Sequence, residues 1–252
     1  GATGGPYIMG LCLSRGMGWQ AGYRTISFLQ MALTLILLLS LPLWKKQELP
    51  LSGGETVRSQ TPQWGKLLKR PGVKAALTAF FFYSALEVTT GLWGSSYMVA
   101  VRGISPETAA KWISLFYLGI TAGRFFSGFL TLRFSDDAMV RLGEGTAIVG
   151  ILLILLPLHN LFLCLGLILT GLGCAPIYPS LLHATPQRFG KSLSQSLMGT
   201  QMAISYLGST TMPPVSGFLS EKISMGLYPV LLLVFALMLT ILTEKGRHCT
   251  AE

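Results

Sequence analysis

The stretch at residues 161–182, LFLCLGLILTGLGCAPIYPSLL, decides the fold class. It contains no charged residue over its whole length. A helix rises ~1.5 Å per residue, so about 20 such residues cross the ~30 Å hydrocarbon core of a bilayer. Further apolar runs occupy residues 26–44, 75–101, 146–158 and 227–242. The sequence therefore predicts an all-α polytopic membrane protein.

The composition agrees with a membrane protein and excludes several other classes. Hydrophobic residues make up 51% of the chain and charged residues 12%, against roughly 25% charged residues in ordinary soluble domains. The 19 Lys and Arg residues outnumber the 10 acids, but they lie in short loops between apolar runs, which argues against nucleic-acid binding. The four cysteines have no CxxC spacing, so we expect no metal site, no disulfide frame and no cofactor. No carboxylate pair or Ser-His pair is expected at membrane depth, so we do not expect an enzyme.

Eight membrane segments can be counted, and the first is the end of a truncated span. The opening GATGGPYIMG is typical of the middle of a protein, so the chain is expected to be a fragment. Strict alternation of the spans places fourteen Lys and Arg residues on the side of the linker 45–74 and five on the other. Because positive residues prefer the cytoplasm, we expect the linker and the C-terminus to be cytoplasmic in a multi-pass cell-membrane protein. The expected segments are 1–14, 25–44, 74–100, 109–134, 145–159, 161–183, 193–219 and 225–243.

The linker contains a candidate helix of its own. Thr61 and Pro62 can cap and start it, and Trp64, Leu67 and Leu68 share one face. This pattern predicts a short helix in the inner membrane interface. A solvated connector is the alternative.

After the linker, the spans form two sets of three, and the last span of each set is almost purely apolar. Spans 145–159 and 225–243 are of this kind, as is 25–44, whereas the other four complete spans are rich in Gly, Ser, Thr, Tyr and Gln. Apolar helices can face lipid, while small and polar residues belong where helices pack closely or line a wet cavity. The repeated pattern is typical of three-helix repeats around a transport cavity.

Several motifs resemble one known family along essentially the whole chain. They are GATGGP at 1–6, ALEVTTGLWGSSYMV at 85–99, GRFFSGFLTLRF at 123–134, GLGCAPIYPSLLHATPQRFG at 171–190 and GSTTMPPVSG at 208–217. Together they are similar to the major facilitator superfamily, in particular its bacterial fucose-permease-like branch.

The resemblance implies a major-facilitator-type bundle of twelve helices in two halves. The chain would supply about seven complete transmembrane helices plus the end of another. Residues 1–44 would then be the end of the N-terminal half, 45–74 the cytoplasmic linker, and 75–252 the C-terminal six-helix half. Helices one to four of the same protein would be missing here.

Glu87 is the acidic residue placed well inside a predicted span. A charged group at that depth costs roughly 2.5–3.5 kcal/mol on insertion scales, so it is expected to face a cavity or a partner. We expect Glu87 to couple transport to protons or to contact the solute. A carboxyl that merely ties two helices together is the alternative.

Further candidate solute-binding residues lie on the polar spans. Tyr83 and Thr90 share the stripe of Glu87, and Trp93 and Tyr97 offer rings on which a sugar could stack, with interfacial anchoring as the alternative. Tyr178 lies in a proline-rich segment expected to bend. Gln201 and Ser205 present hydrogen-bonding groups on one face, although ordinary contacts between helices would use the same groups.

Charged residues around the inner loop that follows span 109–134 complete the list of candidates. The resemblance implies that Arg124, Arg133 and Asp136 act as a conformational latch, and a plain cytoplasmic anchor is the alternative. The sequence thus predicts a secondary transporter of a small polar solute, a sugar or related metabolite, coupled to protons and working by alternating access. Drug or metabolite efflux, or a non-transporting membrane sensor on the same scaffold, remain as alternatives.

Overall fold

The computed structural model describes residues 4–44, 68, 70–157 and 159–251, and no strand occurs among them. The interfacial helix predicted to start at Thr61 falls outside these residues. The described helices are α1 (Gly4–Ser14), α2 (Gly18–Trp44), α4 (Val73–Arg102), α5 (Pro106–Leu130), α6 (Asp136–Leu155), α7 (Asn160–Phe189), α8 (Lys191–Lys222), the short 3₁₀ helix η1 (Met225–Leu227) and α9 (Tyr228–Ala251).

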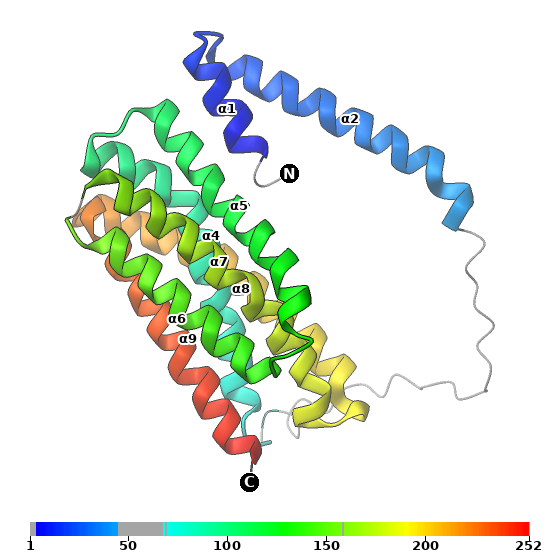
Figure 1. Ribbon diagram of the computed structural model, residues 1–252. Coiled ribbons are helices and arrows are strands. Elements are labelled where there is room, and N and C mark those ends of the chain that lie inside the picture. Colours follow the sequence, from blue (N-terminus) through cyan, green and yellow to red (C-terminus); the bar gives the residue numbers. More distant parts are fainter. Residues whose placement is uncertain (1–3, 45–67, 69, 158, 252) are drawn as a thin grey trace.

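Helices α4 to α9 run side by side as one bundle, with α1 and α2 to one side (Figure 1). In the bundle, α7 packs against both α5 and α6, and α4 packs against both α8 and α9. Helix α1 lies against α5, whereas α2 contacts α1 and extends away from the bundle. One end of the bundle carries the end of α9 and is called the C-terminal end below. The opposite end is called the far end.

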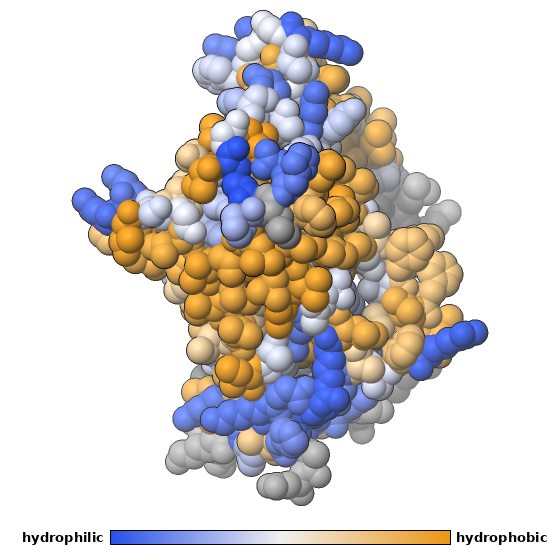
Figure 2. All heavy atoms as spheres, turned by 60° about the vertical axis from the view of Figure 1, so that its left-hand side comes forward, coloured by the Kyte–Doolittle hydropathy of each residue, from blue (hydrophilic) through white to orange (hydrophobic). Residues whose placement is uncertain are grey.

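Among the described residues, six helices are long and apolar enough to cross a membrane, namely α2, α4, α5, α6, α7 and η1 with α9. Helix α8 is equally long at 32 residues but carries more polar side chains. Figure 2 shows apolar residues across the middle of one face and hydrophilic residues above and below them. Such a belt is what a bilayer requires of the protein surface. The prediction of a polytopic helical bundle is confirmed.

Glycines bring the helices into close contact. A Cβ at Gly150 would lie 2.6 Å from the carbonyl oxygen of Gly166, and a Cβ at Gly166 would lie equally close to that of Gly150. At Gly171 a Cβ would collide with the carbonyl oxygen of Phe116. Helices in lipid associate through van der Waals contact rather than through a hydrophobic drive, so small residues at the contact are required. These glycines fix α7 against α5 and α6.

The ends of the helices follow the turn chemistry of the sequence. Gly103 ends α4 with a positive φ of 63°, and Ser105 caps α5, which begins with Pro106. The start of α6 was predicted too late, because Ser135 caps the helix and α6 begins at Asp136 rather than near residue 145. Its first two turns are polar, so hydropathy alone does not mark them as helix.

Helix α7 is also longer than predicted. It continues through Pro186 to Phe189, and only Gly190 separates it from α8. Three prolines are therefore accommodated inside one continuous helix, which extends beyond the predicted span 161–183.

Candidate functional site

Glu87 lies halfway along α4 and faces a cation on the neighbouring helix. Its Oε1 atom is 3.7 Å from Nη2 of Arg124, on α5. The side chain of Glu87 is 24% exposed and that of Arg124 is 55% exposed. Two opposite charges are therefore paired within membrane-crossing helices, and both remain accessible on the surface of the bundle.

The position of Arg124 corrects the sequence prediction. Arg124 was placed with Arg133 and Asp136 in the loop after span 109–134, but it lies inside α5, which continues for six residues to Leu130. The pairing of Arg124 with Glu87 was not predicted, because it depends on how α4 and α5 are rotated toward each other. Arg133 is exposed in the turn that follows α5.

Two glycines on the face of α4 that carries Glu87 allow side chains of neighbouring helices to approach closely. The hydroxyl of Tyr117, on α5, occupies the space that a Cβ at Gly91 would need, and Ile113 Cδ1 lies 2.6 Å from the position of a Cβ at Gly94. Side chains of α5, and the Tyr228 hydroxyl of α9 beside Gly94, therefore occupy the space next to these glycines. Because Gly91 is one turn from Glu87, Tyr117 lies beside the carboxylate.

Tyr83 and Tyr178 connect this region to α7. The hydroxyl of Tyr83 donates a hydrogen bond to the carbonyl oxygen of Cys174 at 3.1 Å, and the Tyr83 side chain is fully buried. The ring of Tyr178 lies 5.6 Å from that of Tyr83 and is partly exposed. Tyr178 is also within electrostatic range of both Glu87 and Tyr206. Tyr206 belongs to α8, and its hydroxyl-bearing ring is 73% exposed.

Gln201 and Ser205 are engaged in contacts between helices. The Thr185 hydroxyl of α7 donates to Oε1 of Gln201 at 3.1 Å, and Gln201 is buried. Ser205 shares a short hydrogen bond with Ser84 of α4. The structure therefore brings both residues to neighbouring helices, where they connect α8 to α7 and α4.

Thr90 and Tyr97 lie in the core of the bundle. Tyr97 is only 4% exposed, and its ring stacks on that of Tyr228 with centroids 5.0 Å apart. Its hydroxyl donates to the carbonyl oxygen of Ile154 at 3.4 Å. The Thr90 hydroxyl donates to Leu86 within α4, and the carbonyl oxygen of Thr90 accepts from Tyr228. These two residues hold α4 against α6 and α9.

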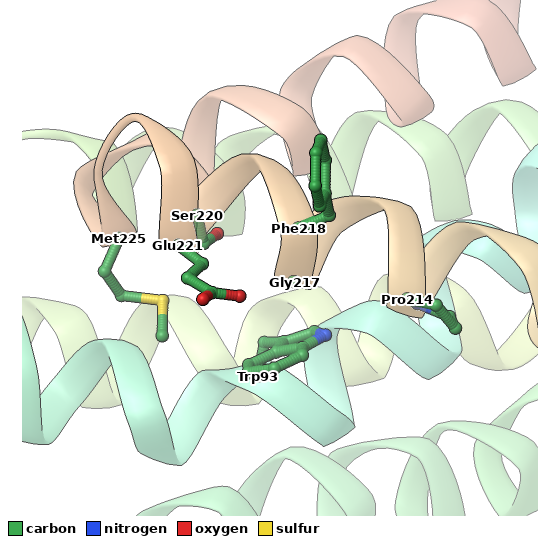
Figure 3. Close-up of a pocket in the computed structure, with 7 residues that line it drawn as sticks. All are labelled: Trp93, Pro214, Gly217, Phe218, Ser220, Glu221 and Met225. Carbon is green, nitrogen blue, oxygen red and sulfur yellow. The ribbon is translucent and has the colours of Figure 1, made fainter.

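Trp93 lines a separate hollow of about 580 Å³ toward the far end of α4 and α8. Its Nε1 donates to the carbonyl oxygen of Pro213 at 2.8 Å, and its ring fills the space beside Gly217. In Figure 3 the side chains of Glu221 and Met225 extend toward the Trp93 ring. Trp93 follows Glu87 by six residues, which turns it ~120° to another face of the helix. The structure therefore does not bring Trp93 to the Glu87–Arg124 pair.

The C-terminal end of the bundle carries several ion pairs. Asp136 pairs with His183 at 2.8 Å, and Asp137 makes a short contact with Arg188. Arg141 donates two hydrogen bonds to Glu244, at 2.7 and 3.0 Å. Each of these pairs joins two helices of the α4–α9 bundle, so they hold the helices of the bundle together at this end.

Glu144 is a buried carboxyl that sequence reasoning missed. It is only 3% exposed and accepts a hydrogen bond from the Thr243 hydroxyl of α9 at 2.8 Å, while its second oxygen has no partner among the described residues. Ser135 followed by two aspartates is the pattern of a helix start. Recognising that pattern would have placed Glu144 inside α6 rather than ahead of it.

Among the described residues, no group of three His, Cys, Asp or Glu side chains is placed to hold a metal ion. The arrangement instead offers a partly exposed charge pair, Glu87 and Arg124, between α4 and α5. Tyrosine hydroxyls from α5, α7 and α8 lie nearby.

Comparison with known proteins identifies the same architecture. Bypass of stop codon protein 6 of Saccharomyces cerevisiae is 23% identical over 197 residues, which cover 72% of this chain and 38% of that protein. A crystal structure of the Escherichia coli fucose:proton symporter FucP aligns with a TM-score of 0.61 at 19% identity, covering 73% of this chain and 44% of that one. The outward conformation of FucP, a Major Facilitator Superfamily transporter, aligns with a TM-score of 0.65 at 18% identity, covering 91% and 54%.

The chain spans about half or less of the length of these proteins. The sequence model of the Major Facilitator Superfamily matches residues 88–245, which is more than half of the chain. Together with the bundle of α4 to α9, this match establishes that the chain belongs to the Major Facilitator Superfamily.

Proposed function

We propose that this chain is the C-terminal part of a secondary active transporter that moves a small polar solute, a sugar or related metabolite, together with protons. The observation that carries the proposal is the Glu87–Arg124 pair, 3.7 Å apart and partly exposed on membrane-crossing helices. A charged side chain that faced lipid at this depth would cost several kcal/mol, so such residues face a water-filled cavity or the interior of a bundle. The partial exposure of both groups favours a wet cavity.

Proton coupling follows from the chemistry of the pair. Opposite charges close to each other favour the ionised forms, whereas desolvation favours the neutral carboxyl. Glu87 would take up a proton when the cavity opens to the acidic side and release it on the other. Tyr178 would offer its hydroxyl to the solute, and Tyr83 would hold α7 against α4.

The remaining candidate residues take supporting roles in this proposal. Gln201 and Ser205 would fix α8 beside the cavity, and Thr90 and Tyr97 would fix α4. Trp93 would contact solute only at the far end, away from Glu87. Arg133 and Asp136 would act in the conformational latch at the C-terminal end.

We propose further that helices one to four of the same protein complete the cavity. Residues 1–44 would end the first half, 45–74 would form the linker, and 75–252 would form the second half. The greater length of the similar proteins supports this division. The linker and C-terminus would be cytoplasmic in the cell membrane, supported by the fourteen-to-five charge asymmetry.

Transport by the full-length protein in proteoliposomes tests the proposal. A pH gradient, acidic outside, should drive accumulation of a solute from a panel of sugars and sugar derivatives. Glu87→Gln should abolish this accumulation but leave solute exchange without a gradient partly intact, because only the proton site is lost. Accumulation that is unchanged in Glu87→Gln would assign Glu87 to structure. Absence of both transport and exchange for the whole panel would favour a non-transporting sensor.

A further inference from the structure

Arg124 is held only loosely by Glu87. One Nη2–Oε1 distance of 3.7 Å joins the two side chains, which is longer than a hydrogen bond. Arg141, by contrast, engages Glu244 with two hydrogen bonds of 2.7 and 3.0 Å. A guanidinium carries five donors in a planar fork, so most donors of Arg124 remain free within the described part of the chain. The group is placed to accept a further ligand.

The free donors of Arg124 are suited to one class of ligand. The guanidinium fork matches the two oxygens of a carboxylate and binds them with two parallel hydrogen bonds. A neutral sugar requires donors and acceptors but no permanent cation. A charged arginine at membrane depth costs free energy. Binding of an anionic solute would explain why an arginine is present at position 124.

The charges around Glu87 allow an exchange of partners. Within the described part of the chain, Arg124 is the cation that forms an ion pair with Glu87. The other titratable groups facing Glu87 from its own and neighbouring helices are Tyr83, Tyr117, Cys174 and Tyr178, all uncharged in their ordinary protonated forms. Protonation of Glu87 would therefore leave Arg124 without a counter-ion, and an arriving carboxylate would restore the balance.

Building on the proposed function, we propose that Arg124 binds a carboxylate of the transported solute, which is a hydroxylated carboxylic acid anion such as a sugar acid. A proton from the outside medium adds to Glu87 and cancels its charge. The solute carboxylate then replaces Glu87 as the partner of Arg124. One proton and one anion enter together because each makes the site favourable for the other. The hydroxyls of Tyr117, Tyr178 and Tyr206 are placed to contact the hydroxyl groups of the solute.

Matched solutes test the substrate class in the full-length protein. Glucuronate and galacturonate differ from glucose and galactose in bearing a carboxylate at one end of the same ring. With an inward pH gradient across proteoliposomes, the uronates should accumulate and the neutral hexoses should not. Accumulation of the hexoses alone would overturn this inference and leave the proposed function standing. Accumulation of neither class would count against both.

Variants of Glu87 and Arg124 test whether the solute carboxylate replaces Glu87 as the partner of Arg124. The measurement is binding of glucuronate to the purified full-length protein. Arg124→Gln should weaken binding roughly ten- to a hundredfold, with Arg124→Lys intermediate because it keeps the charge without the fork. Glu87→Gln should bind glucuronate with an affinity that no longer depends on pH, since Arg124 then faces no ionisable carboxyl at position 87. A Glu87→Gln protein that keeps the original pH dependence would overturn the exchange, as would unchanged affinity in Arg124→Gln.

Discussion

Two tyrosines on the polar spans differ sharply in their surroundings, although the sequence presents them alike. Tyr97 is buried at 4% exposure and hydrogen-bonded to Ile154, whereas Tyr206 is 73% exposed. A buried hydrogen-bonding group that loses its partner destabilises the folded state, whereas an exposed hydroxyl contributes little to its stability. The first ring therefore belongs to the structure, and the second is available to a ligand.

Replacing each tyrosine by phenylalanine separates these roles. Tyr97→Phe should lower the free energy of unfolding by about 1 kcal/mol through loss of one hydrogen bond, with solute affinity unchanged. Tyr206→Phe should leave stability unchanged within about 0.5 kcal/mol and weaken solute binding. Thermal unfolding in detergent and equilibrium binding measure the two effects. Reduced affinity in Tyr97→Phe at unchanged stability would instead support stacking of the solute on Tyr97.

Glu87 was predictable from the sequence because a carboxylate inside an apolar run is unusual whatever lies around it. Its partner Arg124 was not, because residues 87 and 124 meet only through the rotation of α4 against α5. Glu144 was missed for a local reason, since the polar first turns of α6 hide the helix start from a hydropathy scan. Helical geometry alone separates Trp93 from Glu87 on the surface of α4. Which of these two faces of α4 contacts α8 depends on tertiary contacts.

At the scale of helices, glycines decide which elements approach most closely. The apolar runs predicted α2, α4, α6, α7 and α9, yet the contacts between helices follow the small residues of α5, α6 and α7. Gly171 faces the backbone of α5, whereas Gly128, on α5, has no neighbour within 4 Å of its Cβ position. These two glycines provide a test of close approach with a matched control.

Gly171→Ala should destabilise the protein by about 1–3 kcal/mol, because its methyl group would meet the Phe116 carbonyl and push α5 from α7. Gly128→Ala should be neutral or stabilising by up to about 1 kcal/mol, because alanine is the better helix former. Thermal unfolding of the two variants compares them directly. Equal stability of both would show that α5 and α7 are less close than described.

Ion pairs connect these helices at the C-terminal end of the bundle. Arg188, on α7, pairs with Asp137 at the start of α6, and the arginine is the more buried partner. A double-mutant cycle with Arg188→Gln and Asp137→Asn should give a coupling energy of about 0.5–1 kcal/mol, since Asp137 is partly exposed and solvent screens the pair. Additive effects of the two substitutions would contradict a direct interaction.

At the scale of the whole molecule, α4 to α9 form one bundle, and α2 extends from it with its apolar side chains exposed. At the C-terminal end, the pairs of Arg141 with Glu244, His183 with Asp136 and Arg188 with Asp137 join helices within α4–α9. In the proposed transporter, the first half would contact the face that carries Glu87 and Arg124. Alternating access would expose this pair to each side of the membrane in turn.

The charge carried per transport cycle distinguishes the two kinds of solute. If one proton enters on Glu87 with one carboxylate on Arg124, the loaded site carries no extra charge, and a membrane potential does no work on the step. A proton accompanied by a neutral sugar would move one positive charge, worth about 2.3 kcal/mol at 100 mV, or roughly fifty-fold in accumulation. We expect glucuronate accumulation in proteoliposomes to be unchanged when potassium and valinomycin impose a potential of about 100 mV, negative inside, at a fixed pH gradient. A rise approaching fifty-fold would mean that one net positive charge enters with each glucuronate, as with two protons per anion, and would contradict the exchange of one proton on Glu87 for one carboxylate on Arg124.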